Sequence, residues 1–166
     1  VIASMSEDTE KDVHESVRRA RAAQPAWAAS SFHERRTHLL EVRDRLLDST
    51  EDVVDVICSE TGKQPAEAVT TELMAVCETI EWYARNGAAA LRPVAVAPGT
   101  LMHKRAWKEY SPMGVIGVIS PWNYPFTLAM TPLVTALFAG NTVVLKPSEV
   151  TPTIGLAIRD LFSGGP

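Results

Sequence analysis

The sequence predicts an α/β protein in which N-terminal helices pack on a doubly wound parallel sheet. Two observations lead to this fold class. Apolar residues recur at helical spacing over most of residues 8–90, and after Pro112 two short apolar runs alternate with two helical segments. A strand, a helix, a strand and a helix joined by short connections form the βαβ unit of a parallel sheet.

Four helices are expected before the sheet. They cover residues 8–29, 32–47, 50–60 and 65–90. Thr9 is the expected N-cap of the first helix. Gly62 ends the third, because glycine is common just after the last helical turn. The fourth is long, and we expect it to bury an apolar stripe of Val69, Leu73, Val76, Ile80 and Tyr83.

The elements after residue 93 are shorter. Residues 100–110 lack a helical stripe and lie between two turn signals, so we expect an exposed strand or hairpin arm. Residues 113–119 have no polar face, which is typical of a strand buried on both sides of a parallel sheet. The other expected elements are a helix over 126–139, a buried strand over 142–145, a helix over 151–162 and the end of a further strand at 1–4.

Composition and charge exclude several classes of protein. The 166 residues carry 16 Lys and Arg against 20 Asp and Glu, a formal net charge of −4, and 46% are hydrophobic. This excludes intrinsic disorder and leaves no basic stripe for a nucleic acid. No signal peptide is evident, and the apolar runs are too short to span a membrane. Cys58 and Cys77 suggest neither a metal site nor a disulfide framework, so a reducing, cytoplasmic compartment is expected.

Two unusual loops follow the two apolar strands. Their sequences are Ser-Pro-Trp-Asn-Tyr-Pro (120–125) and Lys-Pro-Ser-Glu (146–149). In such sheets, ligands bind at the carboxyl ends of the strands. The amide of Asn123 is an uncharged donor, which suits an oxygen that gains negative charge in a transition state. Trp122 offers a flat face to an aromatic ring, and Lys146 with Glu149 pairs a donor with an acceptor, which suits a sugar diol.

Each of these features also has a purely structural interpretation. Asn123 could cap the next helix, with Pro125 near its first turn. Trp122 could belong to the core, and Lys146 with Glu149 could form a surface ion pair of little energetic weight. The sequence has no Gly-x-Gly-x-x-Gly segment. A glycine-rich phosphate loop therefore cannot be used to choose between the functional and the structural interpretations.

Together, on consecutive strands, the two loops resemble those of the NAD(P)-dependent aldehyde dehydrogenase superfamily, and the resemblance extends over essentially the whole chain. The segments that carry it are Val-Ile-Ala (1–3), Ala-Arg-Ala-Ala (20–23) to Trp27, Glu-Thr-Gly-Lys (60–63), Pro-Met-Gly-Val-Ile-Gly (112–117), Pro-Trp-Asn-Tyr-Pro (121–125), Leu137, Gly-Asn-Thr-Val-Val-Leu-Lys-Pro-Ser-Glu (140–149) and Thr-Pro (151–152). Pro-Trp-Asn-Tyr-Pro and Lys-Pro-Ser-Glu at this separation are a specific combination.

The resemblance implies a role for the residues of both loops. Asn123 corresponds to the amide that stabilises the oxyanion formed when a cysteine thiolate attacks an aldehyde. Lys146 and Glu149 correspond to the pair that holds the adenosine ribose of NAD, or alternatively of NADP. The other residues expected to line or shape the cofactor site are Ser120, Pro121, Trp122, Pro147 and Ser148. No metal ligand is expected.

The resemblance also implies how the chain is organised. Residues 1–98 correspond to the N-terminal helical part of a Rossmann-like cofactor-binding domain and residues 99–111 to an arm of a small oligomerisation domain. Residues 112–166 correspond to the first βαβ part of the cofactor-binding domain. The family's nucleophilic cysteine and general-base glutamate have no counterpart here, because neither Gly-Gln-x-Cys nor Glu-Leu-Gly-Gly occurs. We therefore expect the N-terminal part of a longer enzyme, incomplete at both ends and inactive alone.

The complete enzyme is expected to oxidise a small-molecule aldehyde, such as succinate semialdehyde, to a carboxylic acid as a homodimer or homotetramer. The alternative is a non-catalytic nucleotide-binding or assembly fragment. A cysteine and an acidic base encoded downstream would distinguish the enzyme from this alternative.

Overall fold

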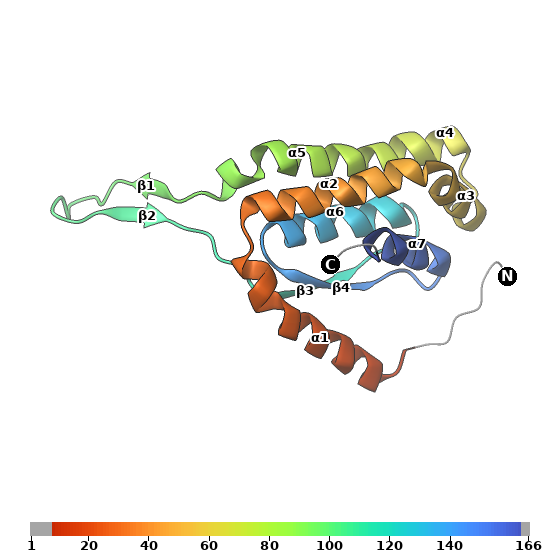
Figure 1. The fold of residues 1–166 in the computed structure, drawn as a ribbon, viewed down its shortest axis with the longest axis horizontal. Helices are drawn as coiled ribbons and strands as arrows, with labels where there is room; N and C mark the ends of the chain where they lie inside the picture. The colour runs from red at the N-terminus through yellow and green to blue at the C-terminus, as the bar shows by residue number, and fades with distance from the viewer. Residues whose placement is uncertain (1–7, 164–166) are drawn as a thin grey trace.

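The structure is a computed structural model that describes residues 8–163. Its elements are α1 (Glu10–Ala29), α2 (Phe32–Asp48), α3 (Thr50–Thr61), α4 (Pro65–Ala68), the π-helical turn η1 (Val69–Leu73), α5 (Met74–Leu91), β1 (Val94–Val96), β2 (Ala106–Lys108), β3 (Val115–Ile119), α6 (Pro125–Phe138), β4 (Thr142–Lys146) and α7 (Pro152–Phe162). Figure 1 shows the β3–β4 sheet between α6, α2 and α5 on one side and α1 on the other, with a hairpin extending from this body. The strand expected at residues 1–4 lies outside the described residues.

The helices form where the sequence predicts them, and their ends carry the expected caps. Thr9 caps α1: its hydroxyl accepts the Asp12 N–H at 3.3 Å, and the Asp12 carboxylate accepts the Thr9 N–H at 2.9 Å. Gly62 ends α3 with a φ of 73°, a left-handed conformation that other residues rarely adopt. No helix within residues 8–163 has the length and apolar character of a membrane span.

The fourth predicted helix is interrupted near its start. α4 and α5 are joined by η1, where the Met74 N–H donates to the Val69 carbonyl in a π-helical turn. Such turns are rare and often occur at functional sites, and this one contains the fully buried Glu72. The expected apolar stripe lies in or against the core, at Val69, Leu73, Val76, Ile80 and Tyr83.

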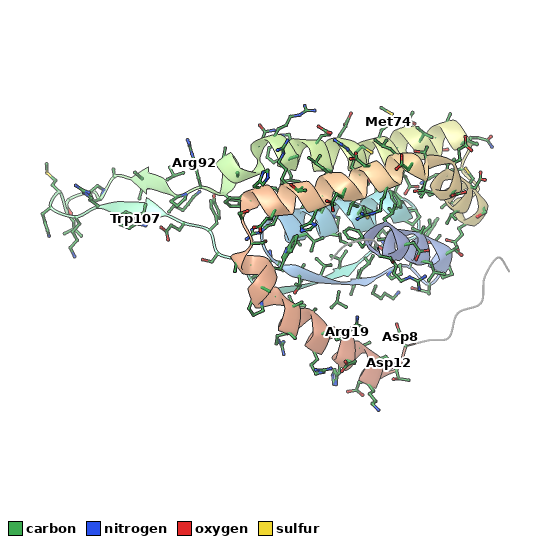
Figure 2. All side chains as sticks on the ribbon, in the orientation of Figure 1. Asp8, Asp12, Arg19, Met74, Arg92 and Trp107 are labelled. Atoms are coloured by element: carbon green, nitrogen blue, oxygen red, sulfur yellow. The ribbon has the colours of Figure 1, made fainter. Side chains whose placement is uncertain are left out.

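The predicted exposed arm is a β-hairpin, whose first strand was not predicted from the sequence. β2 lies inside the expected segment 100–110 and pairs antiparallel with β1, with Val94 opposite Lys108. β1 has three residues, too few for a recognisable alternating pattern. The expected domain boundary at residue 98 falls between β1 and β2. The side chains of the arm project into solvent (Figure 2), and its large exposed apolar members include Val94, Val96, Trp107 and Tyr110.

β3 and β4 form the parallel pair that the βαβ pattern predicts, with Val115 opposite Thr142 and Ile119 opposite Lys146. The expectations that residues 113–119 are buried on both sides and that residues 142–145 form a buried strand are wrong. Val118 is buried, but Ile119 is 81% exposed, and most of β4 is half-buried. Within residues 8–163 the sheet has two strands, so neither strand has the neighbours on both sides that enclose a central parallel strand.

The core between the helices depends on Phe138 at the end of α6. Its ring stacks on Phe32 of α2, with centroids 5.8 Å apart, and on Tyr83 of α5, with centroids 5.6 Å apart. Gly87 of α5 permits this approach, because a Cβ at that position would lie 2.2 Å from Phe138 Cε1. Phe138 thereby fixes α6, the helix that follows the first loop, against α2 and α5.

Candidate active site

The two loops singled out in the sequence start next to each other. Ile119 and Lys146 are opposite in the β3–β4 register, and one residue further on the Ser120 N–H donates to the Lys146 carbonyl at 3.1 Å. Both loops therefore leave the carboxyl edge of the sheet side by side. This is the edge at which ligands of parallel sheets bind.

Asn123 is exposed in the first loop, and its backbone is held. The Asn123 carbonyl accepts a hydrogen bond from Lys63 Nζ at 2.8 Å, whereas no hydrogen bond to its side-chain amide is found within residues 8–163. The alternative in which Asn123 caps α6 is wrong. Tyr124 occupies the N-cap position without a side-chain bond, and the first N–H groups of α6 are taken by Glu72. The amide is therefore available to a ligand.

Glu72 and Lys63 support this loop from the helical layer. Glu72 is fully buried, and its Oε2 accepts the N–H groups of Phe126 at 2.8 Å and Thr127 at 3.3 Å. Its other oxygen pairs with Lys63, whose ammonium also lies 3.9 Å from the centroid of the Tyr124 ring. Neither residue was predicted from the sequence to belong to the site. The available signal was a carboxylate next to Leu73, within the apolar stripe of the fourth helix.

The second loop is packed against the protein at its centre and exposed at its charged ends. Pro147 packs on Gly155 of α7, where a Cβ would lie 2.5 Å from Pro147 Cγ. Ser148 is buried and turns the chain, since its hydroxyl accepts the Val150 N–H at 3.2 Å. Lys146 and Glu149 form an ion pair with both side chains mostly exposed. The hydrogen bond from Lys146, together with one from the backbone of Glu149 itself, lowers the pKa of the Glu149 carboxyl.

A second carboxylate, that of the half-buried Glu60, caps the helix after this loop. Glu60 of α3 accepts the N–H groups of Thr153 at 2.9 Å and Ile154 at 3.1 Å, in the first turn of α7. The helix N-terminus favours a negative charge, because its first N–H groups are unpaired and its dipole is positive. Glu60 and Glu72 thus fix the helices that follow both loops.

Three hydroxyls near these loops are buried without a hydrogen-bond partner in the described part of the chain: Ser120, Thr151 and Thr153. Ser120 lies at the end of β3, where the first loop begins. Buried hydroxyls are normally bonded, so Ser120 Oγ has an unused hydrogen-bonding capacity at the start of the first loop. Trp122 is 59% exposed, so the alternative that places it in the core is wrong.

Neither cysteine belongs to this site. Cys58 and Cys77 are half-buried on α3 and α5, not on the loops. Burial raises the pKa of the Cys77 thiol, against an opposing effect of the Arg43 charge. A nucleophilic cysteine needs the opposite shift, because the thiolate is the reactive form.

Comparison with known proteins gives a consistent result. The model of the aldehyde dehydrogenase family matches residues 1–164. A putative aldehyde dehydrogenase-like protein of Schizosaccharomyces pombe is 36% identical over 142 residues, which cover 84% of this chain and 27% of that protein. A putative succinate-semialdehyde dehydrogenase (NADP+) 2 of Mycobacterium ulcerans is 38% identical over 157 residues, 93% of this chain and 30% of that protein. The chain spans less than a third of either relative.

The fold is also that of solved structures. The crystal structure of an NADP-dependent enzyme of E. coli superposes with a TM-score of 0.88 at 30% sequence identity. The match covers 97% of this chain and 33% of that one.

Proposed function

Because the chain belongs to the aldehyde dehydrogenase family, we propose that it is the part of an NAD(P)-dependent oxidoreductase that brings the oxyanion donor and the ribose-binding loop together. The complete enzyme oxidises an aldehyde to a carboxylic acid through a cysteine thiohemiacetal. One observation carries the proposal: the exposed Asn123 amide, which makes no hydrogen bond within residues 8–163, follows the carboxyl end of β3, and the second loop begins beside it.

Asn123 acts when a thiolate adds to the aldehyde carbon. The new C–S bond forms as the carbonyl π electrons move onto the oxygen, and the Asn123 Nδ2–H donates to that oxygen. An amide suits the step because it is an uncharged donor. The thiolate is supplied from outside this chain, since Cys58 and Cys77 lie on α3 and α5 rather than on either loop.

The ends of β3 and β4 have groups that fit a dinucleotide cofactor. Ser120 Oγ is buried without a partner in the described part of the chain, and the charged ends of Lys146 and Glu149 are exposed. We assign the adenosine ribose to Lys146 and Glu149. The residues that line or shape the rest of the cofactor site are Ser120, Pro121, Trp122, Pro147 and Ser148. The bound cofactor supplies the hydride acceptor.

We predict that the complete enzyme prefers NAD to NADP and that Glu149→Gln narrows this preference several-fold. An ionised Glu149 can accept hydrogen bonds from both ribose hydroxyls of NAD, and it repels the 2′-phosphate of NADP. The measurement is kcat/KM with each cofactor. Glu78→Gln, which neutralises an exposed carboxylate on α5, is the matched control. A preference for NADP, as the name of the mycobacterial relative specifies, or one indifferent to Glu149 contradicts the assignment.

The remaining assignments rest on the relatives and on exposed surface. The mycobacterial relative's name supports a semialdehyde such as succinate semialdehyde as the substrate. The exposed apolar side chains of the β1–β2 hairpin support a homodimer or homotetramer, because a second subunit would cover them. The two free cysteines support a cytoplasmic location.

The isolated chain tests whether these residues can oxidise an aldehyde without the rest of the enzyme. We expect a pure sample of these 166 residues to show no NAD-dependent aldehyde oxidation and to self-associate, because exposed apolar residues such as Ile119 have no cover. The measurements are NADH absorbance and light scattering. Turnover by the isolated chain contradicts the proposal. NAD binding by the complete protein without turnover supports the alternative of a non-catalytic nucleotide-binding protein.

A further inference from the structure

The Glu72 carboxylate links three structural elements. It projects from the π-helical turn η1, binds the first turn of α6 through Phe126 and Thr127, and pairs with Lys63. Lys63 in turn donates to the carbonyl of Asn123 at 2.8 Å. Asn123 is therefore held on both sides, by its own carbonyl and by the start of the helix that follows it two residues later.

Both charges are removed from solvent. The Glu72 side chain is 0% exposed and that of Lys63 9% exposed. Burial of an ion pair generally contributes little net stability, because the loss of hydration offsets the attraction. Its geometry, however, is well defined, since Lys63 and Glu72 each make directed bonds to the backbone of the same segment.

Glu72 also determines which donors remain for a ligand at this loop. The N-terminus of a helix ordinarily binds anions through its free N–H groups. In α6 the N–H groups of Phe126 and Thr127 are already used by Glu72. A developing negative charge beside this loop is therefore directed to the Asn123 side chain.

We infer that Lys63 and Glu72 form a positioning pair, which holds the Asn123 amide where the oxyanion develops and prevents the N-terminus of α6 from competing for it. The inference rests on the proposed role of Asn123 as the oxyanion donor. Neither Lys63 nor Glu72 touches the reacting atoms, so both act through Asn123.

The chain contains a matched control for this pair. Glu60 caps α7 by accepting two N–H groups of its first turn, one at each carboxylate oxygen, and within residues 8–163 it makes no hydrogen bond to the loop of Asn123. Glu60→Gln and Glu72→Gln therefore each remove one capping charge from a helix N-terminus, and only Glu72→Gln weakens the support of Asn123.

The test measures the rate of acylation in single turnover, at saturating cofactor, in the complete enzyme. Glu72→Gln should slow acylation by about tenfold to a hundredfold, since small misplacements of a catalytic group have effects of that size. Glu60→Gln should slow it much less. Lys63→Arg, which keeps the charge, should retain more of the rate than Lys63→Gln.

A double-mutant cycle separates positioning from general stability. In an Asn123→Ala background, Glu72→Gln should change the acylation rate by less than about twofold, because the group it positions is gone. Equal effects of Glu72→Gln with and without Asn123 would assign Glu72 a structural role only and overturn the inference. An unchanged rate in Glu72→Gln alone would also overturn it.

Amide hydrogen exchange tests the positioning pair independently of the proposed oxyanion role of Asn123. Glu72→Gln should speed the exchange of peptides covering residues 121–127, and Glu60→Gln should not. If Asn123→Ala leaves acylation unchanged, the oxyanion role fails. If Asn123→Ala slows acylation but Glu72→Gln changes neither the exchange of this loop nor the rate, the oxyanion role stands and the positioning pair is wrong.

Discussion

Asn123→Ala is expected to slow acylation in the complete enzyme by about 10²–10³-fold, equivalent to about 2.7–4 kcal/mol of transition-state stabilisation. The side-chain amide makes no hydrogen bond within residues 8–163, so its loss leaves no internal partner unsatisfied. The effect should therefore fall on the rate and leave folding and cofactor affinity nearly intact. Single-turnover kinetics measure the acylation rate, and a cofactor titration measures the affinity for the cofactor.

Asn86→Ala is the matched control for this variant. Asn86 is an exposed asparagine on α5 whose amide donates to the carbonyl of Trp82 in its own helix. Its removal should leave acylation unchanged. Wild-type single-turnover kinetics in Asn123→Ala would show that Asn123 carries no charge-stabilising function, despite its place at the carboxyl edge of the sheet.

Phe138→Ala is expected to lower the free energy of unfolding of the chain by about 3–5 kcal/mol, the usual cost of removing a buried aromatic ring. The ring is 2% exposed and lies between Phe32 and Tyr83, against the bare backbone at Gly87. These neighbours lie on α2 and α5, two packed helices, so the cavity cannot close easily. Urea denaturation, monitored by circular dichroism, measures the decrease in the free energy of unfolding.

Met74→Ala provides the comparison. Met74 projects from α5 into solvent (Figure 2) and is 48% exposed. Its substitution should change the unfolding free energy by less than about 0.5 kcal/mol, as is usual at the surface. Equal losses in the two variants would contradict the assignment of Phe138 to the centre of the helix packing.

Local sequence signals predicted most of the fold. Thr9 and Gly62 marked helix ends because caps depend on residues close in the chain. β1 was missed because it has three residues and is defined by its partner β2. The burial of β3 was overestimated because an apolar strand does not indicate how much of the sheet surrounds it, and Ile119 is exposed here.

In the candidate site, too, local sequence patterns predicted the loops but not the distant residues that support them. Its two loops were found from composition and from their place after two apolar strands, and the structure brings their starts together through Ser120 and Lys146. The groups that support them come from distant positions: Glu72 binds Phe126, 54 residues later, and Glu60 binds Thr153, 93 residues later. Contacts at such separations arise from tertiary packing, so periodicity could mark Glu72 as unusual but could not name its partner.

The proposed function is tested by the reaction of the complete protein with an aldehyde, such as succinate semialdehyde, and NAD. We predict that NADH and the carboxylic acid form in equal amounts. We also predict that an acyl group trapped during turnover lies on a cysteine outside these 166 residues, and that this acyl group forms far more slowly in Asn123→Ala. Absence of NADH formation, or an acyl group found on Cys58 or Cys77, would contradict the proposed function.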